Sequence, residues 1–227
     1  MGILRRMIVM RPVLEMNTPD GFDLWPVVET ERFGFLPLGG GLSPAEVGTA
    51  LMRIAACNDV DPTDDEGRPP RPTEPVSGFL HGLLTLDHLY AAGGLQVTDT
   101  ATDVVFSPGC CDGLEDWRAW YVLADCGGEI GYGHEPLSSL AERLGDTVRL
   151  TVDTDRTDSP VIDLPVTELR RLLAEAERDL TGFLAVAADW VSEHLPGHSA
   201  PLVAALARVL DVPPPGLPQA PPTTERA

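Results

Sequence analysis

The stretch from Thr167 to about His194 constrains the fold most, because apolar residues recur along its whole length at helical spacing. These residues are Leu169, Leu172, Leu173, Ala176, Leu180, Phe183, Leu184, Ala187, Trp190 and Val191. Gly182 is a weak point inside this stretch, since glycine is a poor helix former. A long helix with one apolar stripe needs a second layer of structure to cover that stripe.

Short strand patterns supply such a layer. Apolar and polar residues alternate over 147–152, which is typical of a half-buried strand, and 161–164 is expected to pair with it across an Asp-rich turn. Further short strands are predicted at 95–97, 104–106 and 130–132. The first 56 residues indicate short strands followed by a helix.

Four more helices are predicted at 43–56, 76–94, 113–124 and 199–210. The first begins with Ser43-Pro44-Ala45-Glu46, which offers a capping box with proline in the first turn. The fold class is therefore α+β: a small, mostly antiparallel sheet packed with amphipathic helices, including one long C-terminal helix.

Composition divides the chain into four parts. Residues 1–57 form a small N-terminal αβ unit, and residues 58–75 form an acidic, Pro-rich linker. Residues 76–212 form the main α+β unit, and residues 213–227 form a disordered Pro-rich tail. The sequence leaves open whether the first unit packs against the main one.

All sixteen Lys and Arg residues of the chain are arginine. The lack of lysine excludes Schiff-base chemistry, phosphate binding through a Walker-type lysine, protein kinases and serine–lysine hydrolases. The chain also contains no Gly-x-Ser-x-Gly elbow and no His-Glu-x-x-His helix. No complete catalytic constellation is recognisable, which favours a function without catalysis.

Thirty-five Asp and Glu residues give a formal net charge of −19, and most of the excess falls within 76–212. Such a charge argues against nucleic acid and anionic membranes as partners, and it suits a basic protein partner. No apolar run approaches the length of a signal-peptide core or of a membrane span. We therefore expect a cytoplasmic protein with reduced thiols, and the sequence does not specify its oligomeric state.

Cys110 and Cys111 stand out because they follow a predicted strand and precede a predicted helix. Asp112 and Glu115 are expected to cap that helix as a capping box. A thiol at a helix N-terminus can have a lowered pKa, so either cysteine could pair with His134 as a nucleophile.

The same two cysteines, with Cys126 and His134, could instead surround a zinc ion. Adjacent cysteines do not have the usual spacing of a zinc knuckle, and small buried apolar residues are the simpler interpretation. No other cofactor is expected.

The sequence CCDGLEDW at 110–117, followed by GYGH at 131–134, resembles a class of uncharacterised proteins from high-GC actinobacteria. The resemblance implies an origin and no activity. The leading interpretation is a non-catalytic, acidic binding or inhibitor protein, comparable to immunity proteins, for a basic protein partner. The alternative is a thiol-dependent or zinc-binding enzyme, or a redox sensor, that uses Cys110, Cys111 and His134.

Overall fold

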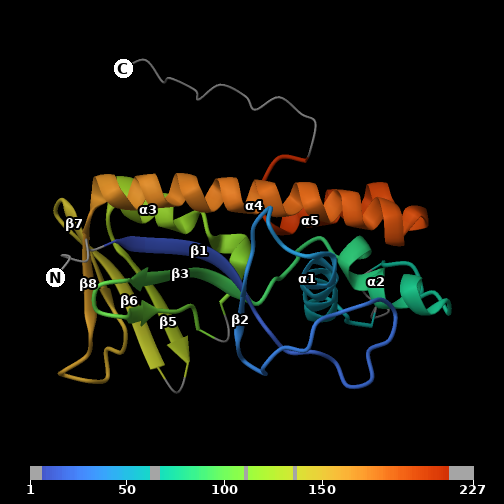
Figure 1. Ribbon diagram of the computed structural model, residues 1–227, viewed down its shortest axis with the longest axis horizontal. Helices are drawn as coiled ribbons and strands as arrows, with labels where there is room; N and C mark the ends of the chain where they lie inside the picture. Colours follow the sequence, from blue (N-terminus) through green and yellow to red (C-terminus); the bar gives the residue numbers. More distant parts are fainter. Residues whose placement is uncertain (1–6, 62–66, 110–111, 135–136, 215–227) are drawn as a thin grey trace, which may run out of the picture.

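The computed structural model describes residues 7–61, 67–109, 112–134 and 137–214. Within these ranges the chain forms five α-helices, two short 3-10 helices and two four-stranded antiparallel sheets (Figure 1). The predicted α+β class is therefore confirmed. None of the helices in these ranges is long and apolar enough to cross a membrane.

The first sheet has the strand order β2-β1-β3-β4, and the second is a meander with the order β5-β6-β7-β8. The strands are β1 (Ile8–Glu15), β2 (Phe35–Pro37), β3 (Gly93–Asp99), β4 (Val104–Phe106), β5 (Glu129–His134), β6 (Leu137–Leu144), β7 (Thr147–Thr151) and β8 (Val161–Pro165). The predicted strands at 95–97, 104–106, 130–132, 147–152 and 161–164 correspond to β3, β4, β5, β7 and β8.

Helices and strands follow one another in groups along the chain. They are α1 (Pro44–Cys57), α2 (Pro75–Thr85), η1 (Leu114–Asp116), α3 (Ala119–Cys126), α4 (Val166–His194), η2 (Pro196–His198) and α5 (Ser199–Val209). The predicted capping box of α1 is present, because Ser43 Oγ accepts from the Glu46 N–H while the Glu46 carboxylate accepts from the Ser43 N–H.

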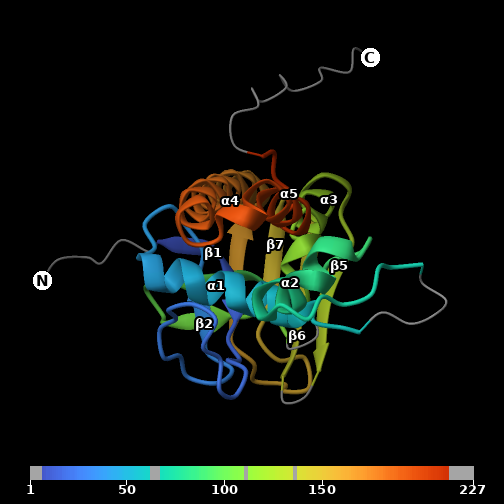
Figure 2. The same ribbon diagram turned by 90° about the vertical axis from the view of Figure 1, so that its right-hand side faces the viewer.

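Helix α4 runs along the top of the molecule, above β1, as the sequence pattern requires (Figure 1). All ten apolar residues predicted for its stripe are buried. Viewed end-on, α4 lies beside α5 and α3, and these helices form a layer over the strands (Figure 2). The long helix therefore organises one hydrophobic core that both sheets share.

Gly182, the weak point of α4, lies where the loop before α1 meets the helix. A Cβ atom added to Gly182 would approach the Gly40 nitrogen to 3.1 Å, tighter than ordinary van der Waals contact. Glycine at this position therefore permits a backbone-to-backbone approach that a larger residue would widen.

The N-terminal and main parts of the chain share one sheet. Strand β1 pairs with β3 from Ile8 opposite Asp99 to Leu14 opposite Gly93. The predicted linker is described over 58–61 and 67–75, and its second stretch lies against α2, where His81 Nε2 is 2.9 Å from the Pro69 carbonyl oxygen. The N-terminal part of the chain therefore packs extensively against the main part, a question that the sequence left open. The tail beyond residue 214 lies outside the described residues.

Two secondary-structure predictions were wrong in detail, and one strand was not predicted. The helix predicted for 76–94 ends at Thr85, because Gly93 and Gly94 begin the strand that pairs with β1. The helix predicted for 113–124 is divided into η1 and α3. Strand β6 was not predicted, because its sequence lacks a simple polar–apolar alternation.

Candidate binding cavity

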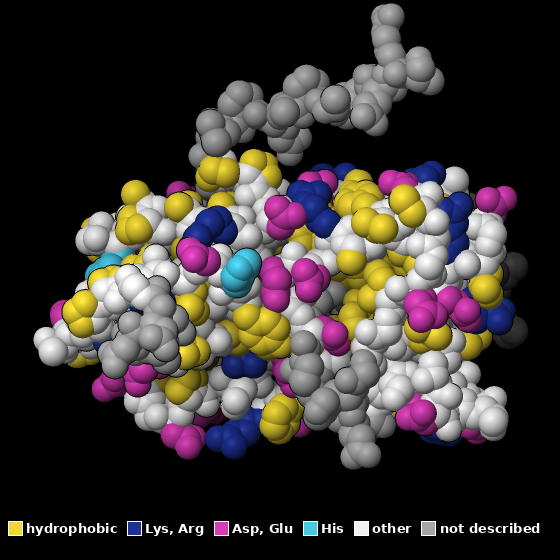
Figure 3. Space-filling model, turned by 180° about the vertical axis from the view of Figure 1, so that it is seen from behind, with side chains coloured by type: hydrophobic (Ala, Val, Ile, Leu, Met, Phe, Trp, Pro, Cys, Tyr) yellow, Lys and Arg dark blue, Asp and Glu magenta, His cyan; other side chains and the backbone are white. Residues whose placement is uncertain are grey.

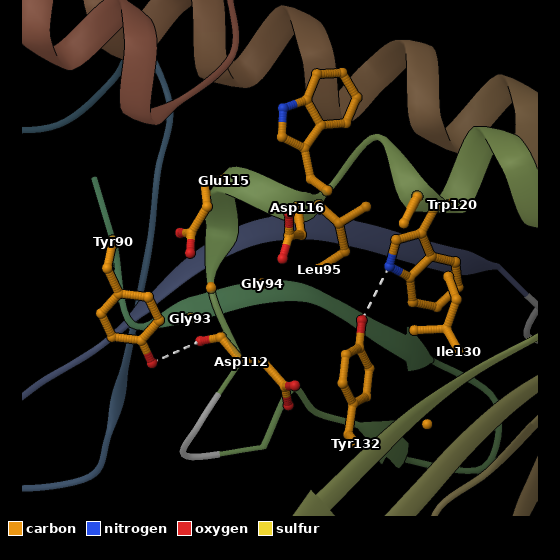
Figure 4. Close-up of a pocket in the computed structure, with 14 residues that line it drawn as sticks. Tyr90, Gly93, Gly94, Leu95, Asp112, Glu115, Asp116, Trp120, Ile130 and Tyr132 are labelled. Atoms are coloured by element: carbon orange, nitrogen blue, oxygen red, sulfur yellow. Dashed lines mark hydrogen bonds between the residues drawn. The ribbon is translucent and has the colours of Figure 1, made fainter. Parts of the chain in front are cut away.

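A cavity of about 450 Å³ lies between the start of β3, the segment around η1, and β5. Figure 4 shows its lining, with Tyr90 at one end and Tyr132 at the other. Its walls consist of Tyr90, Gly93, Gly94, Leu95, Asp112, Gly113, Glu115, Asp116, Trp117, Ala119, Trp120, Ile130, Gly131 and Tyr132. The cavity thus combines three carboxylates with four aromatic side chains.

Backbone hydrogen bonds hold the η1 segment against the chain just before β3. The Gly93 N–H donates to the Asp112 carbonyl oxygen at 3.0 Å, and the Leu114 N–H donates to the Ala91 carbonyl oxygen at 2.8 Å. The Tyr90 hydroxyl donates to the same Asp112 carbonyl at 3.1 Å. These contacts fix the segment from both sides and place its acidic side chains at the cavity.

Gly113 is required for this arrangement. The Glu115 carboxylate folds back over it, so a Cβ atom at position 113 would lie 1.9 Å from Glu115 Oε1. Any side chain at this position would push the carboxylate away. The turn therefore depends on glycine to keep Glu115 in place.

The predicted capping box of Asp112 and Glu115 is contradicted. Asp112 Oδ2 accepts from the Gly109 N–H at 2.6 Å, and Glu115 Oε2 accepts from the Ala91 N–H at 2.9 Å. No side chain caps η1. Asp112 thus closes a local turn with Gly109, whereas Glu115 bridges to Ala91, 24 residues away, because the segment is held by tertiary contacts and does not continue as a regular helix.

Burial raises the pKa of both the Asp112 and the Glu115 carboxyl above its ordinary value. The backbone N–H that each accepts partly opposes this, while the nearby Asp116 charge adds to it. In the described ranges, no arginine pairs with Asp112, Glu115 or Asp116. The cavity therefore holds negative charge that the surrounding described side chains do not neutralise.

Hydrogen bonds hold the aromatic side chains of the cavity wall in place. Trp120 Nε1 donates to the Tyr132 hydroxyl oxygen at 3.0 Å, and Trp117 Nε1 donates to the Leu210 carbonyl oxygen at 2.8 Å. Tyr132 is only 7% exposed, and burial raises the pKa of its phenol. Its oxygen accepts from the indole, and a phenolic hydroxyl can in addition donate one hydrogen bond.

The cavity lies on the side of the molecule where α3 and β5 are found (Figure 2). Seen from behind, this side shows acidic side chains close to one another near the middle, beside a histidine and hydrophobic surface (Figure 3). Acidic and apolar surface thus adjoin on this face.

The predicted thiol and zinc sites are not tested. Cys110 and Cys111 lie outside the described residues, and so does the side chain of His134, whose backbone ends β5 opposite Leu137. Cys126 ends α3 and is exposed. Within the described part of the chain, no three His, Cys, Asp or Glu side chains are placed to hold one metal ion. Both site interpretations stay predictions.

The local sequence does not predict the cavity, and the interpretation of Asp112 and Glu115 as helix caps assigned two of its lining residues to another role. The available signal was the density of carboxylates and aromatic residues in one short stretch, 109–120, that contains two glycines. The cavity forms because this stretch contacts Tyr90 and Tyr132, and the sequence does not reveal those contacts.

No protein-family model matches the chain, and comparison with curated proteins and with solved structures likewise finds no match. The resemblance based on CCDGLEDW and GYGH therefore stays a prediction.

Proposed function

We propose that the protein is a non-catalytic binding protein for a basic protein partner, and that the cavity receives an arginine or lysine side chain of that partner. The observation that carries the proposal is the meeting of Asp112, Glu115 and Asp116 with four aromatic side chains around one cavity. A cytoplasmic location belongs to the same proposal, and the exposed thiol of Cys126 suits a reducing compartment.

A cation in this cavity would relieve an electrostatic cost. Burial is the main cause of the raised pKa of Asp112 and of Glu115, and repulsion from the nearby Asp116 charge adds to it. A guanidinium group offers several N–H donors to carboxylates and a flat face to aromatic rings. The chain itself contains such a pair, because the guanidinium of Arg118 lies 4.3 Å from the Trp117 ring centroid.

The overall charge supports a basic partner over nucleic acid. A net charge of −19 repels phosphate backbones and accelerates encounter with positively charged proteins. Binding should therefore weaken as the salt concentration rises.

The proposal can be tested by titrating the protein with arginine amide at low ionic strength while recording tryptophan fluorescence. Trp117 and Trp120 line the cavity, so an occupant should change their emission. Citrulline amide, the neutral analogue, is the ligand control. We expect saturable binding of arginine amide and none of citrulline amide.

Two variants localise the response. Asp116→Asn should lower the affinity for arginine amide about 10-fold or more, since it removes one charged partner. Glu175→Gln, which removes one charge on the exposed side of α4, is the matched control and should change the affinity little. Equal binding of both amides, or equal effects of both variants, would contradict the proposal.

The thiol-dependent or zinc-binding alternative has one supporting observation. Asp112 lines the cavity, and Cys110 and Cys111 directly precede it in the chain. This alternative predicts stoichiometric zinc in protein purified without chelator, or thiols that alkylate unusually fast. Replacing both cysteines with serine separates the two functions, because recognition of arginine amide should survive the replacement.

A further inference from the structure

We infer that the cavity is one half of a longer acidic groove that binds an extended peptide segment with two basic side chains. This inference rests on the proposed function and adds the form of the partner: a flexible loop or terminus, with one cationic side chain in each half of the groove. A second, adjoining hollow is the observation that carries it.

The second hollow has a volume of about 300 Å³. Asp87, His88 and Leu89, from the turn after α2, form one part of its wall, and Arg208 and Val209 of α5 form another. Glu115 and Asp116 complete the lining. It is therefore a polar site built from segments far apart in the sequence.

Glu115 and Asp116 line both the cavity and the second hollow. The short helix η1 that carries them consequently forms the boundary between the two spaces. Figure 4 shows their side chains projecting from this turn, above the space between Tyr90 and Tyr132. A ligand that occupies both hollows must cross this boundary, and an extended main chain with a side chain on either side can do so.

The charges of the two hollows differ in a way that suits a peptide. The cavity is lined by three carboxylates and no arginine, whereas the second hollow adds Asp87 and also Arg208. One Arg208 nitrogen is 3.5 Å from the Leu86 carbonyl oxygen, a long contact that leaves the guanidinium able to donate elsewhere. Arg208 could therefore donate to a peptide carbonyl while Asp87 holds the second cationic side chain.

The cavity offers a matching donor at its other end. Tyr132 is more than nine-tenths buried, and because its oxygen accepts from Trp120 Nε1, its hydroxyl group can still donate to one acceptor. A main-chain carbonyl satisfies that donor, whereas an isolated metal ion or ammonium ion has no acceptor to offer. The groove thus offers carboxylates to cationic side chains and hydrogen-bond donors to main-chain carbonyls, and a basic peptide can use both.

The test compares ligands with one and with two arginines by isothermal titration calorimetry at low ionic strength. The probes are arginine amide and acetylated, amidated peptides in which one, two or three glycines separate two arginines. In matched peptides, citrulline replaces each arginine in turn. We expect one spacing to bind at least about 10-fold more tightly than arginine amide, because the second site is filled at a high effective concentration.

The variant Asp87→Asn assigns the second arginine to the second hollow. In this variant, the best two-arginine peptide should lose most of its advantage over arginine amide. Its affinity should fall to about that of the matched peptide in which citrulline replaces one arginine. The variant Asp112→Asn, on the cavity side, should weaken the binding of both ligands. Glu175→Gln on α4 is again the charge control.

The failures of the two proposals are distinguishable. If arginine amide binds but no two-arginine peptide binds more tightly, the groove is wrong and the cavity proposal stands. A gain that persists unchanged in Asp87→Asn would also overturn the groove, because the second arginine would then lie elsewhere. If neither ligand binds, both proposals fail.

Discussion

Carboxylates on helix α4 and carboxylates around the cavity belong to the same acidic chain, yet their surroundings differ. On α4, Arg171 lies 2.6 Å from a Glu168 oxygen and also pairs with Glu175, one turn further along. The hydrogen bond from Arg171 lowers the pKa of Glu168. Around the cavity the pKa of Asp112 and that of Glu115 move in the opposite direction.

Net charge alone therefore does not locate a binding site in this protein. On α4, Glu168 and Glu175 pair with arginines three or four residues away and belong to a solvated helix surface. Those around the cavity face each other and aromatic rings, without an arginine among the described residues that pairs with them. Carboxylates that no arginine of the described residues neutralises can bind an external cation, whereas carboxylates that already pair with an arginine offer it little.

The largest expected effect concerns the structural side of this comparison, the inner face of α4. Phe183→Ala removes a fully buried ring from the apolar stripe and should destabilise the fold by about 3–5 kcal/mol. Thermal denaturation followed by circular dichroism measures it. The exposed Val122→Ala on α3 is the control and should change stability by less than about 0.5 kcal/mol. Equal melting temperatures for both variants would show that α4 does not organise the core.

The next effect is the pH dependence of cation binding in the cavity. Binding needs ionised carboxylates, and the raised pKa of Asp112 and of Glu115 means that these groups gain protons earlier as the pH falls. Affinity for arginine amide should therefore decrease as the pH falls, starting at a higher pH than ordinary carboxyl groups would give. Fluorescence titrations at a series of pH values measure this, and a constant affinity across the range would contradict it.

A smaller effect is expected on stability at the cavity. A carboxyl with a raised folded-state pKa contributes stability that is present below its unfolded pKa and is lost as the pH rises through the folded pKa. Glu115→Gln should therefore be as stable as the wild type at neutral pH, or more stable by up to about 1 kcal/mol in free energy of unfolding. Its melting temperature should accordingly be equal or slightly higher. It should also bind arginine amide more weakly. A clear loss of stability would mean that the Glu115 charge itself stabilises the turn.

The smallest effect is expected on the outer surface of α4. Glu168→Gln removes one partner of the Arg171 pair, and exposed pairs at this spacing contribute about 0.5 kcal/mol or less. Because its folded-state pKa is lowered, the stability contributed by Glu168 is present above its unfolded pKa and is lost as the pH falls through the folded pKa. Denaturant titration at pH 7 and at pH 3 should show a small difference from the wild type only at pH 7.

Local patterns predicted much of the fold, because the elements concerned obey local rules. The stripe of α4, the capping box at Ser43 and Glu46 and the alternation in β7 depend on periodicity and capping within a few residues. The end of α2 was misplaced because pairing of 93–99 with β1, more than 75 residues away, overrides the local apolar pattern.

The cavity was harder to predict for the same reason. An Asp followed three residues later by a Glu looks the same whether the pair caps a helix or bridges to distant backbone. In the folded chain Glu115 accepts from Ala91, 24 residues away, and Trp120 meets Tyr132 of β5. Nothing in the local sequence of 110–117 distinguishes these outcomes. Tertiary contacts decide whether such residues serve structure or recognition.

The most direct test of the account is a measurement of individual carboxyl pKa values by carbon-detected NMR, with and without arginine amide. In the free protein, Asp112 and Glu115 should titrate above the ordinary range, and Glu168 below it. Arginine amide should lower the pKa of Asp112 and of Glu115 and leave that of Glu168 unchanged, because a bound cation stabilises only the charges that it contacts. If the ligand shifts none of the cavity carboxyls, or shifts Glu168 equally, the cavity is not a cation site and the account is wrong.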